Sequence, residues 1–278
     1  MSGEAGLLLV PFPHQQESPA SWITRAALSQ GSTVKEFLSV LEINATEDID
    51  MFVSTVDLDR VRRVTGLRAH DFWLAQRLFG GLKELDLPAE DFLLFGRHRR
   101  PRYRYCPKCL ASNRVAYFPI HWRFAGFKYC MLHHCMLEEV CQKCEAPVLL
   151  PVNQLTAGPK KQGVAYLKRC MSCDADLSRV EPVSTAMMTS LLSQWEQTLL
   201  RNGIATLSAL YNRKVVLRET EEQKSFSYLR SLYKKRVLPN DPRQLTPNVV
   251  LGRWAARMAV RQDQKKRSRA QETPTIEL

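Results

Sequence analysis

The residues of this chain best suited to chemistry are cysteines and histidines that recur in pairs between positions 105 and 174. This stretch contains all eight cysteines of the chain. Two residues separate the potential ligands within each pair, a spacing that lets a tight turn point two soft donors at one tetrahedral ion. Four such pairs predict two complete structural zinc sites. The pairs are Cys106 and Cys109, Cys130 and His133, Cys141 and Cys144, and Cys170 and Cys173.

The sequence leaves the pairing of these half-sites open. In a sequential arrangement, the first two pairs hold one zinc ion and the last two pairs hold the other. A cross-braced arrangement, first pair with third and second with fourth, uses the same residues. His134 and Cys135 follow His133 directly, so either is an alternative fourth ligand of the first site.

Disulfides and catalytic zinc explain these residues less well. Disulfides need an oxidising compartment, whereas residues 1–16 contain no basic leader and only a four-residue apolar run, so we expect a cytoplasmic protein with reduced thiols. Catalytic zinc needs an open coordination position and a nearby general base. Eight ligands for two ions leave no position open, and no paired carboxylates or nucleophile–base arrangement accompany them. We therefore expect no enzymatic activity.

The net charge favours a polyanionic partner. The 278 residues include 40 Lys and Arg against 28 Asp and Glu, a formal charge of +12. Such an excess is typical of proteins that bind DNA or RNA, although a generally basic surface is the ordinary alternative. No apolar run approaches the roughly 20 residues that cross a bilayer, so no membrane partner is expected.

The hydrophobic periodicity predicts a mainly α protein with small zinc-ribbon β modules. Ser18 followed by Pro19 is a favoured helix start, and a second start follows at Ser32 or Thr33. Strand-like segments at 148–150 and 164–167 flank a loop and predict a zinc ribbon.

Further helices are expected towards the C-terminus. An apolar face recurs from Met187 through Trp195 to Leu199, with Gly203 past the end of the helix, and another helix is expected over 226–238. We divide the chain into an N-terminal helical domain with a helix-turn-helix, a tandem zinc-binding domain, and a C-terminal helical, basic domain. Their ranges are 1–100, 101–180 and 181–278.

Residues 57–79 have the order helix, glycine-containing turn, helix. The turn is expected at Thr65-Gly66-Leu67, and the second helix from Arg68 to Phe79. This order is the skeleton of a DNA-binding helix-turn-helix, although many structural helical corners share it. The polar candidates for DNA contact on the second helix are Arg68, His70, Asp71 and Gln76.

The densest basic run before the C-terminus covers residues 97–108. Alternate side chains on an extended strand point to opposite faces, so several arginines here could follow one phosphate backbone. A solvated linker into the zinc domain is the alternative. The candidate contacts are Arg97, Arg99, Arg100, Arg102 and Arg104.

The last helix, expected over 248–270, has two faces. Leu251, Trp254 and Met258 recur at spacings of three and four, which predicts an apolar face turned inward. A basic stripe on the same helix favours a polyanionic partner over a solvated, frayed terminus. The stripe consists of Arg253, Arg257, Arg261 and Lys265, with Lys266 and Arg267 beside it.

Several of these segments together resemble the TniQ/TnsD family. Pro11-Phe12-Pro13, followed by residues 17–25 (ESPASWITR), is similar to the opening of these proteins, and the Val64-Thr65-Gly66-Leu67 turn resembles their helix-turn-helix. The Cys/His pairs between 105 and 144 are similar to their zinc signature. The resemblance covers about residues 8–175, and the order of the parts is more specific than any single one.

The resemblance implies a target-selection subunit of a transposon. In that family the protein connects a target, recognised by its own DNA binding or by a CRISPR effector with guide RNA, to an AAA+ ATPase regulator that recruits the transposase. The chain looks shorter than members that read an attachment site directly, which favours an adaptor. A direct sequence-specific DNA reader and an RNA-binding zinc protein are the alternatives. A bacterial, nucleoid-associated location and a homodimer are further expectations.

Overall fold

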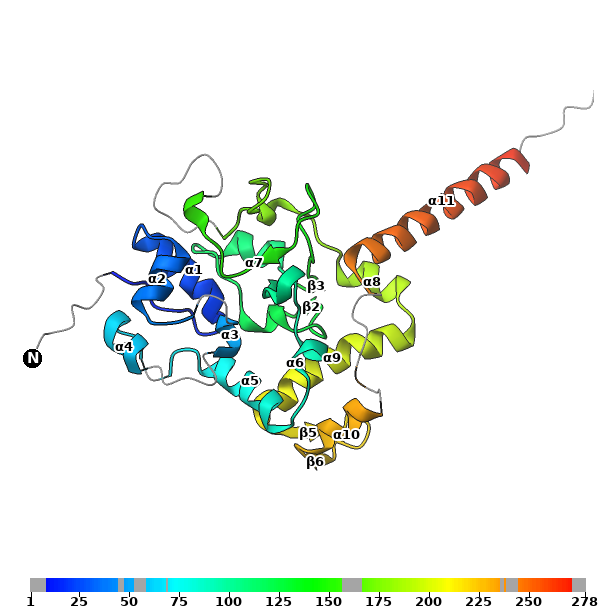
Figure 1. The fold of residues 1–278 in the computed structure, drawn as a ribbon. Coiled ribbons are helices and arrows are strands. Elements are labelled where there is room, and N and C mark those ends of the chain that lie inside the picture. Colours follow the sequence, from blue (N-terminus) through cyan, green and yellow to red (C-terminus); the bar gives the residue numbers. More distant parts are fainter. Residues whose placement is uncertain are drawn as a thin grey trace, which may run out of the picture.

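A computed structural model describes residues 9–44, 48–52, 59–68, 70–156, 167–235, 238 and 245–271, with side chains up to residue 264 in the last helix. Helices form most of the regular structure, and the described strands form two-stranded sheets. Figure 1 shows the N-terminal helices on one side of the central segment and the long C-terminal helix projecting from the other. The N-terminal helices are α1 (Pro19–Ser29), α2 (Val34–Val40), α3 (Ile49–Phe52), α4 (Asp59–Thr65), α5 (Trp73–Glu84) and α6 (Ala89–Phe92).

Both predicted helix starts near the N-terminus are confirmed. Ser18 caps α1 and accepts a hydrogen bond from the Ser21 amide, with Pro19 as the first helical residue. Thr33 caps α2 in a capping box with Glu36, in which each side chain binds the other residue's backbone amide. These starts depend only on local residues, and therefore the sequence identifies them.

The extended segment before α1 is fastened to that helix. Trp22 donates its indole N–H to the Pro11 carbonyl at 2.7 Å. Arg25 forms a buried ion pair with Glu17 and also donates to the Phe12 carbonyl at 3.1 Å. Two side chains of α1 therefore hold the Pro-Phe-Pro segment in place without any regular secondary structure there.

The helix expected to restart at Arg68 begins five residues later, so that expectation was wrong. Phe72 adopts a left-handed conformation (φ 62°) directly before α5 and is buried, with its ring centroid 5.3 Å from that of Trp22. The left-handed conformation of Phe72 and its packing against α1 together delay the start of the helix. Asp71 lies in the preceding turn, where it accepts from the Arg68 amide at 2.7 Å and pairs with the Arg68 guanidinium.

The central segment consists of short elements between the metal-ligand pairs. Its sheets pair β1 with β4 and β2 with β3, both antiparallel. The expected ribbon partner at 164–166 lies outside the described residues. The strand at 148–149 pairs instead with the arginine-rich segment. The elements are η1 (Arg97–Arg99), β1 (Arg102–Tyr103), α7 (Pro107–Ser112), η2 (Ile120–Arg123), β2 (Tyr129–Cys130), β3 (Cys135–Met136), β4 (Val148–Leu149), η3 (Gln154–Thr156) and η4 (Leu177–Arg179).

A buried ionic cluster joins this central segment to the N-terminal helices. The Arg123 side chain is fully buried and forms ion pairs with Asp48 and Asp50. Asp50 also accepts hydrogen bonds from the Ala20 amide and the Tyr103 hydroxyl. Burial raises the pKa of Asp50, and Arg123 opposes that rise. The cluster therefore connects α1, α3, β1 and η2 in one polar network.

The C-terminal segment was expected to start with one helix over 187–199, and the structure has two. Ser193 interrupts the apolar repeat and starts a new helix with a capping box to Glu196. Trp195, which belongs to the expected apolar face, is 65% exposed. The remaining elements are α8 (Thr185–Leu191), α9 (Gln194–Asn212), β5 (Lys214–Val216), β6 (Gln223–Ser225), α10 (Tyr228–Lys234) and α11 (Pro247–Gln271). The β5–β6 hairpin was not predicted.

Helix α9 packs against α5 and the central segment (Figure 1). Gly203 lies in the middle of this helix rather than past a helix end, and a Cβ added there would overlap the Gly126 backbone. Arg77 of α5 donates to the Tyr211 carbonyl, and Arg213 donates back to the Arg77 carbonyl. These reciprocal bonds fix the two helices side by side.

The last helix matches its expected extent but not its expected orientation. Trp254 is 42% exposed and Leu251 is 38% exposed, so this face is not turned inward. The helix instead rests on α8 and α9 through its arginines, with Arg257 donating to the Ser190 carbonyl at 2.6 Å. Val250 is its fully buried residue near the start.

The buried core is continuous along most of the described chain. One hydrophobic cluster extends from Ala20 to Leu238, and a smaller one joins Met136 to α8 and the start of α11. The three-domain division stays a prediction. Among the helices that the structure describes, none is long and apolar enough to span a bilayer.

Removal of the buried arginine should unfold the protein more readily. Arg123→Met leaves the carboxylates of Asp48 and Asp50 without their cation, so we expect a loss of about 3–5 kcal/mol in the free energy of unfolding, measured by urea denaturation. Arg99→Met, which removes an exposed ion pair with Glu90, is the control and should change little. Equal stability of the two variants would contradict this role for Arg123.

Candidate metal centre

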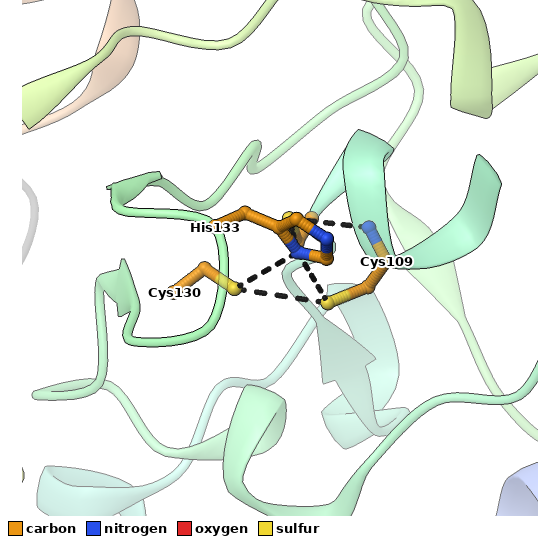
Figure 2. A group of neighbouring side chains, drawn as sticks. Cys109, Cys130 and His133 are labelled. Carbon is orange, nitrogen blue, oxygen red and sulfur yellow. Dashed lines mark hydrogen bonds between the residues drawn. The ribbon is translucent and has the colours of Figure 1, made fainter. Parts of the chain in front are cut away.

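Four predicted ligands come together at the first centre. The ligand atoms of Cys106, Cys109, Cys130 and His133 all lie within 4.8 Å of one another. The Nδ1 atom of His133 lies 3.6 Å from the Cys106 sulfur and 3.2 Å from the Cys109 sulfur, and the Cys109 and Cys130 sulfurs are 3.7 Å apart. In Figure 2 the His133 ring points to the same space as the sulfurs of Cys109 and Cys130.

Two local structures deliver these ligands. Cys106 is the N-cap of α7, with Pro107 at its first position, and the Cys106 sulfur accepts from the Cys109 amide at 3.4 Å. The first turn of this short helix brings the two sulfurs to the same side. Cys130 ends β2 and His133 lies in the turn between β2 and β3. A helix start and a hairpin turn therefore face each other.

The second centre contains cysteines alone. Cys141, Cys144, Cys170 and Cys173 form a second group within 4.8 Å, with 3.6 Å from Cys141 to Cys173 and from Cys144 to Cys170. Each pair closes a tight turn, since the Glu145 amide donates to the Cys141 carbonyl and the Asp174 amide to the Cys170 carbonyl. Glu145 and Asp174 are left-handed, with φ of 58° each.

The geometry decides the pairing of the half-sites. The first two pairs meet in one cluster and the last two in the other, which is the sequential arrangement rather than the cross-braced one. Tetrahedral zinc with bonds of about 2.3 Å to sulfur and 2.0–2.1 Å to nitrogen separates two sulfurs by about 3.8 Å, and a sulfur from a nitrogen by about 3.6 Å. The observed separations of 3.2–3.7 Å fit such an ion.

The neighbouring histidines have other partners. The ring of His134 is 2.9 Å from the Tyr129 hydroxyl and its carbonyl accepts from Thr185, so it does not enter the first group. His121 packs against Phe127, with ring centroids 4.6 Å apart, and burial lowers its pKa to about 4. The His121 ring packs against an aromatic ring and lies outside both Cys/His groups.

The protein brings the thiols of the first centre close enough to share protons. The pKa of Cys106 falls to about 7, chiefly because the Cys109 thiol donates a hydrogen bond to its sulfur. Bonds from Cys106 and Cys109 likewise lower the pKa of Cys130. At the second centre burial raises the pKa of Cys170 to about 12. Metal binding would displace the remaining protons, since the thiolate is the ligand.

The arginines of residues 97–104 do not form one extended row. Arg97, Arg99 and Arg100 are exposed in and after η1. Arg102 is half-buried and lies 3.7 Å from a Glu139 carboxylate oxygen. Arg104 is 2% exposed, pairs with Glu139 at 2.8 Å, and donates to the carbonyls of residues 124, 125 and 127. Its guanidinium is therefore inside the protein and out of reach of a phosphate, contrary to expectation.

Of the four polar residues expected on the second helix of the helix-turn-helix, only Gln76 lies on α5. Arg68, His70 and Asp71 precede the helix. Since α9 packs along α5, part of that helix is covered. The helix-turn-helix remains a prediction.

The C-terminal stripe is divided between internal and outward contacts. Arg253 pairs with Glu196 at 2.8 Å and Arg257 contacts α8, whereas Arg261 is exposed. The side chains of Lys265, Lys266 and Arg267 lie outside the described residues, although α11 continues through them.

The fold and the two centres define a mainly helical protein held together around paired Cys/His clusters. The TniQ family model matches residues 8–137, from the extended N-terminal segment through the first centre to β3. These residues form a TniQ domain, which supports a TniQ family protein, and this domain implies a role in target selection during transposition. A search of curated proteins gives no match.

Loss of one ligand should release one metal ion. Cys170→Ser should lower the bound metal from two ions per chain to one and unfold the surrounding turns, because metal binding and folding are coupled. Metal analysis by mass spectrometry and circular dichroism would measure both. Ser172→Ala, between the ligands, is the control and should keep two ions. Full metal content in Cys170→Ser would refute the ligand assignment.

The buried carboxyl of Glu138 should make stability depend on pH. Burial raises its pKa to about 7, and a hydrogen bond from Gln142 only partly opposes this. Because the pKa of Glu138 is higher in the folded than in the unfolded protein, protonation of this carboxyl stabilises the folded state. The stabilisation is complete below about pH 4.5 and is lost as the pH rises through about 7. Relative to the wild type, Glu138→Gln should gain stability between pH 5.5 and pH 8, by up to about 3 kcal/mol. Parallel urea titrations that differ by a constant amount would contradict this.

Proposed function

We propose that this protein is a non-enzymatic target-selection adaptor of a transposition system. It links target DNA, or a CRISPR effector with guide RNA, to an AAA+ ATPase regulator that recruits the transposase. The match of residues 8–137 to the TniQ family carries this proposal. The two metal centres and the continuous core support it, because an adaptor must hold two binding surfaces in a fixed relation.

The ions in both centres are zinc in this proposal. Three sulfurs and one imidazole, or four sulfurs, at tetrahedral separations are the donor sets of structural zinc sites. The ligands would supply folding energy and no open position for chemistry. Zinc therefore orders the short turns and strands on which the partner surfaces rest.

The DNA surface in this proposal is basic and exposed. Arg97 and Arg100 lie at the surface beside η1, and Arg261 lies on the projecting part of α11. Lys265, Lys266 and Arg267 follow on the same helix. Cations that neutralise phosphates release counterions, so binding of this kind weakens steeply with salt.

The protein surface in this proposal lies at the first metal centre. Met131 and Leu132, between ligands Cys130 and His133, are 57% and 74% exposed. Beside them an apolar groove of about 670 Å³ runs between the turn, α5 and α9, with Leu74 and Ile204 in its lining. Exposed apolar side chains on a rigid turn mark protein contacts, and we assign this surface to the ATPase regulator.

DNA binding should depend on the basic surface. Reversal of Arg97, Arg100 and Arg261 to glutamate should weaken binding to duplex DNA at least several-fold and reduce the slope of log K against log salt by about one per lost phosphate contact, in fluorescence anisotropy at several salt concentrations. Arg201→Glu, at an exposed position of α9, is the control. An unchanged slope would mean that these arginines are only solvated. A footprint at one defined site without a guide complex would instead favour a direct DNA reader.

A recruitment assay should show that binding of the ATPase regulator can be lost without loss of DNA binding. Leu132→Asp should abolish capture of the ATPase regulator on DNA beads while DNA binding and zinc content stay normal, because it places a charge on the apolar turn without removing a ligand. Leu251→Asp on α11 is the control for an exposed leucine elsewhere. Normal capture by Leu132→Asp would remove the first centre from the proposed interface.

A further inference from the structure

The first metal centre has a fifth potential donor. The Cys135 sulfur lies 3.7 Å from the Cys106 sulfur, the same separation as between the ligand sulfurs of Cys109 and Cys130. Cys135 is 1% exposed, yet it does not belong to the four donors that lie within 4.8 Å of one another. It faces the centre from just outside the ligand set.

The backbone holds Cys135 in this position independently of a metal. Cys130 and Cys135 are direct partners in the antiparallel register of β2 and β3. On its other side Cys135 pairs with Ser184, and the next amide, of Met136, donates to the Val183 carbonyl at 2.9 Å. A strand with neighbours on both sides therefore fixes this sulfur.

His133 has a less constrained position. It lies in the turn between β2 and β3, next to the left-handed residue His134 (φ 49°) and the exposed Leu132. The backbone of the turn is held at its ends by the pairing of Cys130 with Cys135, and at the His134 carbonyl by hydrogen bonds from Thr185. The histidine ligand thus lies in the turn of the hairpin, whereas the spare sulfur lies on the paired strand β3.

We propose that Cys135 is a reserve zinc ligand, which replaces His133 in the first centre when the imidazole is removed or withdrawn from the metal. The exchange breaks the bond from zinc to His133 Nδ1, forms a bond from zinc to the Cys135 sulfur, and releases the thiol proton to solvent. The site changes from three sulfurs and one nitrogen to four sulfurs, a donor set that zinc accepts equally. This inference rests on the proposed zinc occupancy and is independent of the adaptor role.

Ligand exchange would act on the apolar turn. When His133 leaves the metal, residues 131–133 lose their attachment to the centre, while Cys130 and Cys135 keep the centre intact and Thr185 still holds the His134 carbonyl. The exposed side chains Met131 and Leu132 could then change position without loss of the ion. The ordinary alternative is an inert buried thiol, which is common for free cysteines.

Zinc content of four full-length proteins tests the inference. The wild type and Cys135→Ser should each hold two zinc ions per chain, since His133 is the ligand in both. His133→Ala should also hold two, because Cys135 takes the vacated position. The double variant His133→Ala/Cys135→Ser should hold one. Zinc is measured by mass spectrometry on purified protein, with circular dichroism to verify folding.

Cobalt(II) gives a second readout on the same proteins. Replacement of nitrogen by sulfur in His133→Ala should strengthen the sulfur-to-cobalt charge-transfer absorption and move the visible bands to longer wavelength, and Cys135→Ser should leave the wild-type spectrum unchanged. His133→Asn, which keeps a polar group in the turn, is read in the same way if His133→Ala does not fold. If neither His133 variant folds, Cys135 is not a competent ligand and the inference is overturned.

The other outcomes separate the inference from the zinc proposal. A wild type without zinc would refute the zinc assignment itself. One ion in folded His133→Ala shows that Cys135 does not substitute, and two ions in the double variant show that neither residue is needed. Loss of an ion from Cys135→Ser would make Cys135 a primary ligand. Each of these three results overturns the reserve role.

Discussion

The position of Arg123 between Asp48 and Asp50 is the constraint on which the rest of the structure depends. A buried guanidinium is costly unless its charge is matched, so the two carboxylates must stay beside it. Arg123 belongs to the segment between the two halves of the first metal centre, whereas Asp50 lies in α3 and Asp48 directly precedes that helix. The requirement for charge pairing therefore forces these two parts of the chain together, and the metal ligands are placed relative to α1 by the same contact.

The sequence predicted the parts of the structure that depend on local chemistry. Ser18 and Thr33 cap helices because the residues that follow supply their partners, and the ligand pairs close tight turns because both donors come from one short segment. The members of both Cys/His groups were predicted from spacing alone. The pairing of the half-sites was not, since both arrangements use identical residues and only the fold brings one pair next to another.

The expectations that failed depend on contacts from distant residues. Arg104 looks like its exposed neighbours in sequence, but Glu139 and three carbonyls enclose it. The start of α5 is delayed because Phe72 packs on Trp22, fifty residues earlier. The break before α9 could have been found, because Ser193 and Glu196 have the spacing of a capping box. The apolar residues on both sides of Ser193 have the spacing of one continuous helix. This pattern obscured both the helix break at Ser193 and the exposure of Trp195.

The start of α11 is anchored to the central segment, and the length of the helix determines how far its other end can reach. The buried amine of Lys128 donates to the Leu245 carbonyl at 2.6 Å, which fixes the chain two residues before this helix begins. With 25 residues at about 1.5 Å each, α11 is about 37 Å long. This is about the length of eleven base-pair steps of duplex DNA, or roughly one turn. Arg253 and Arg257 hold the first part of the helix against α9 and α8, so only the residues after Arg257, about 21 Å of helix, extend beyond this contact and set how far a partner at the far end lies from it.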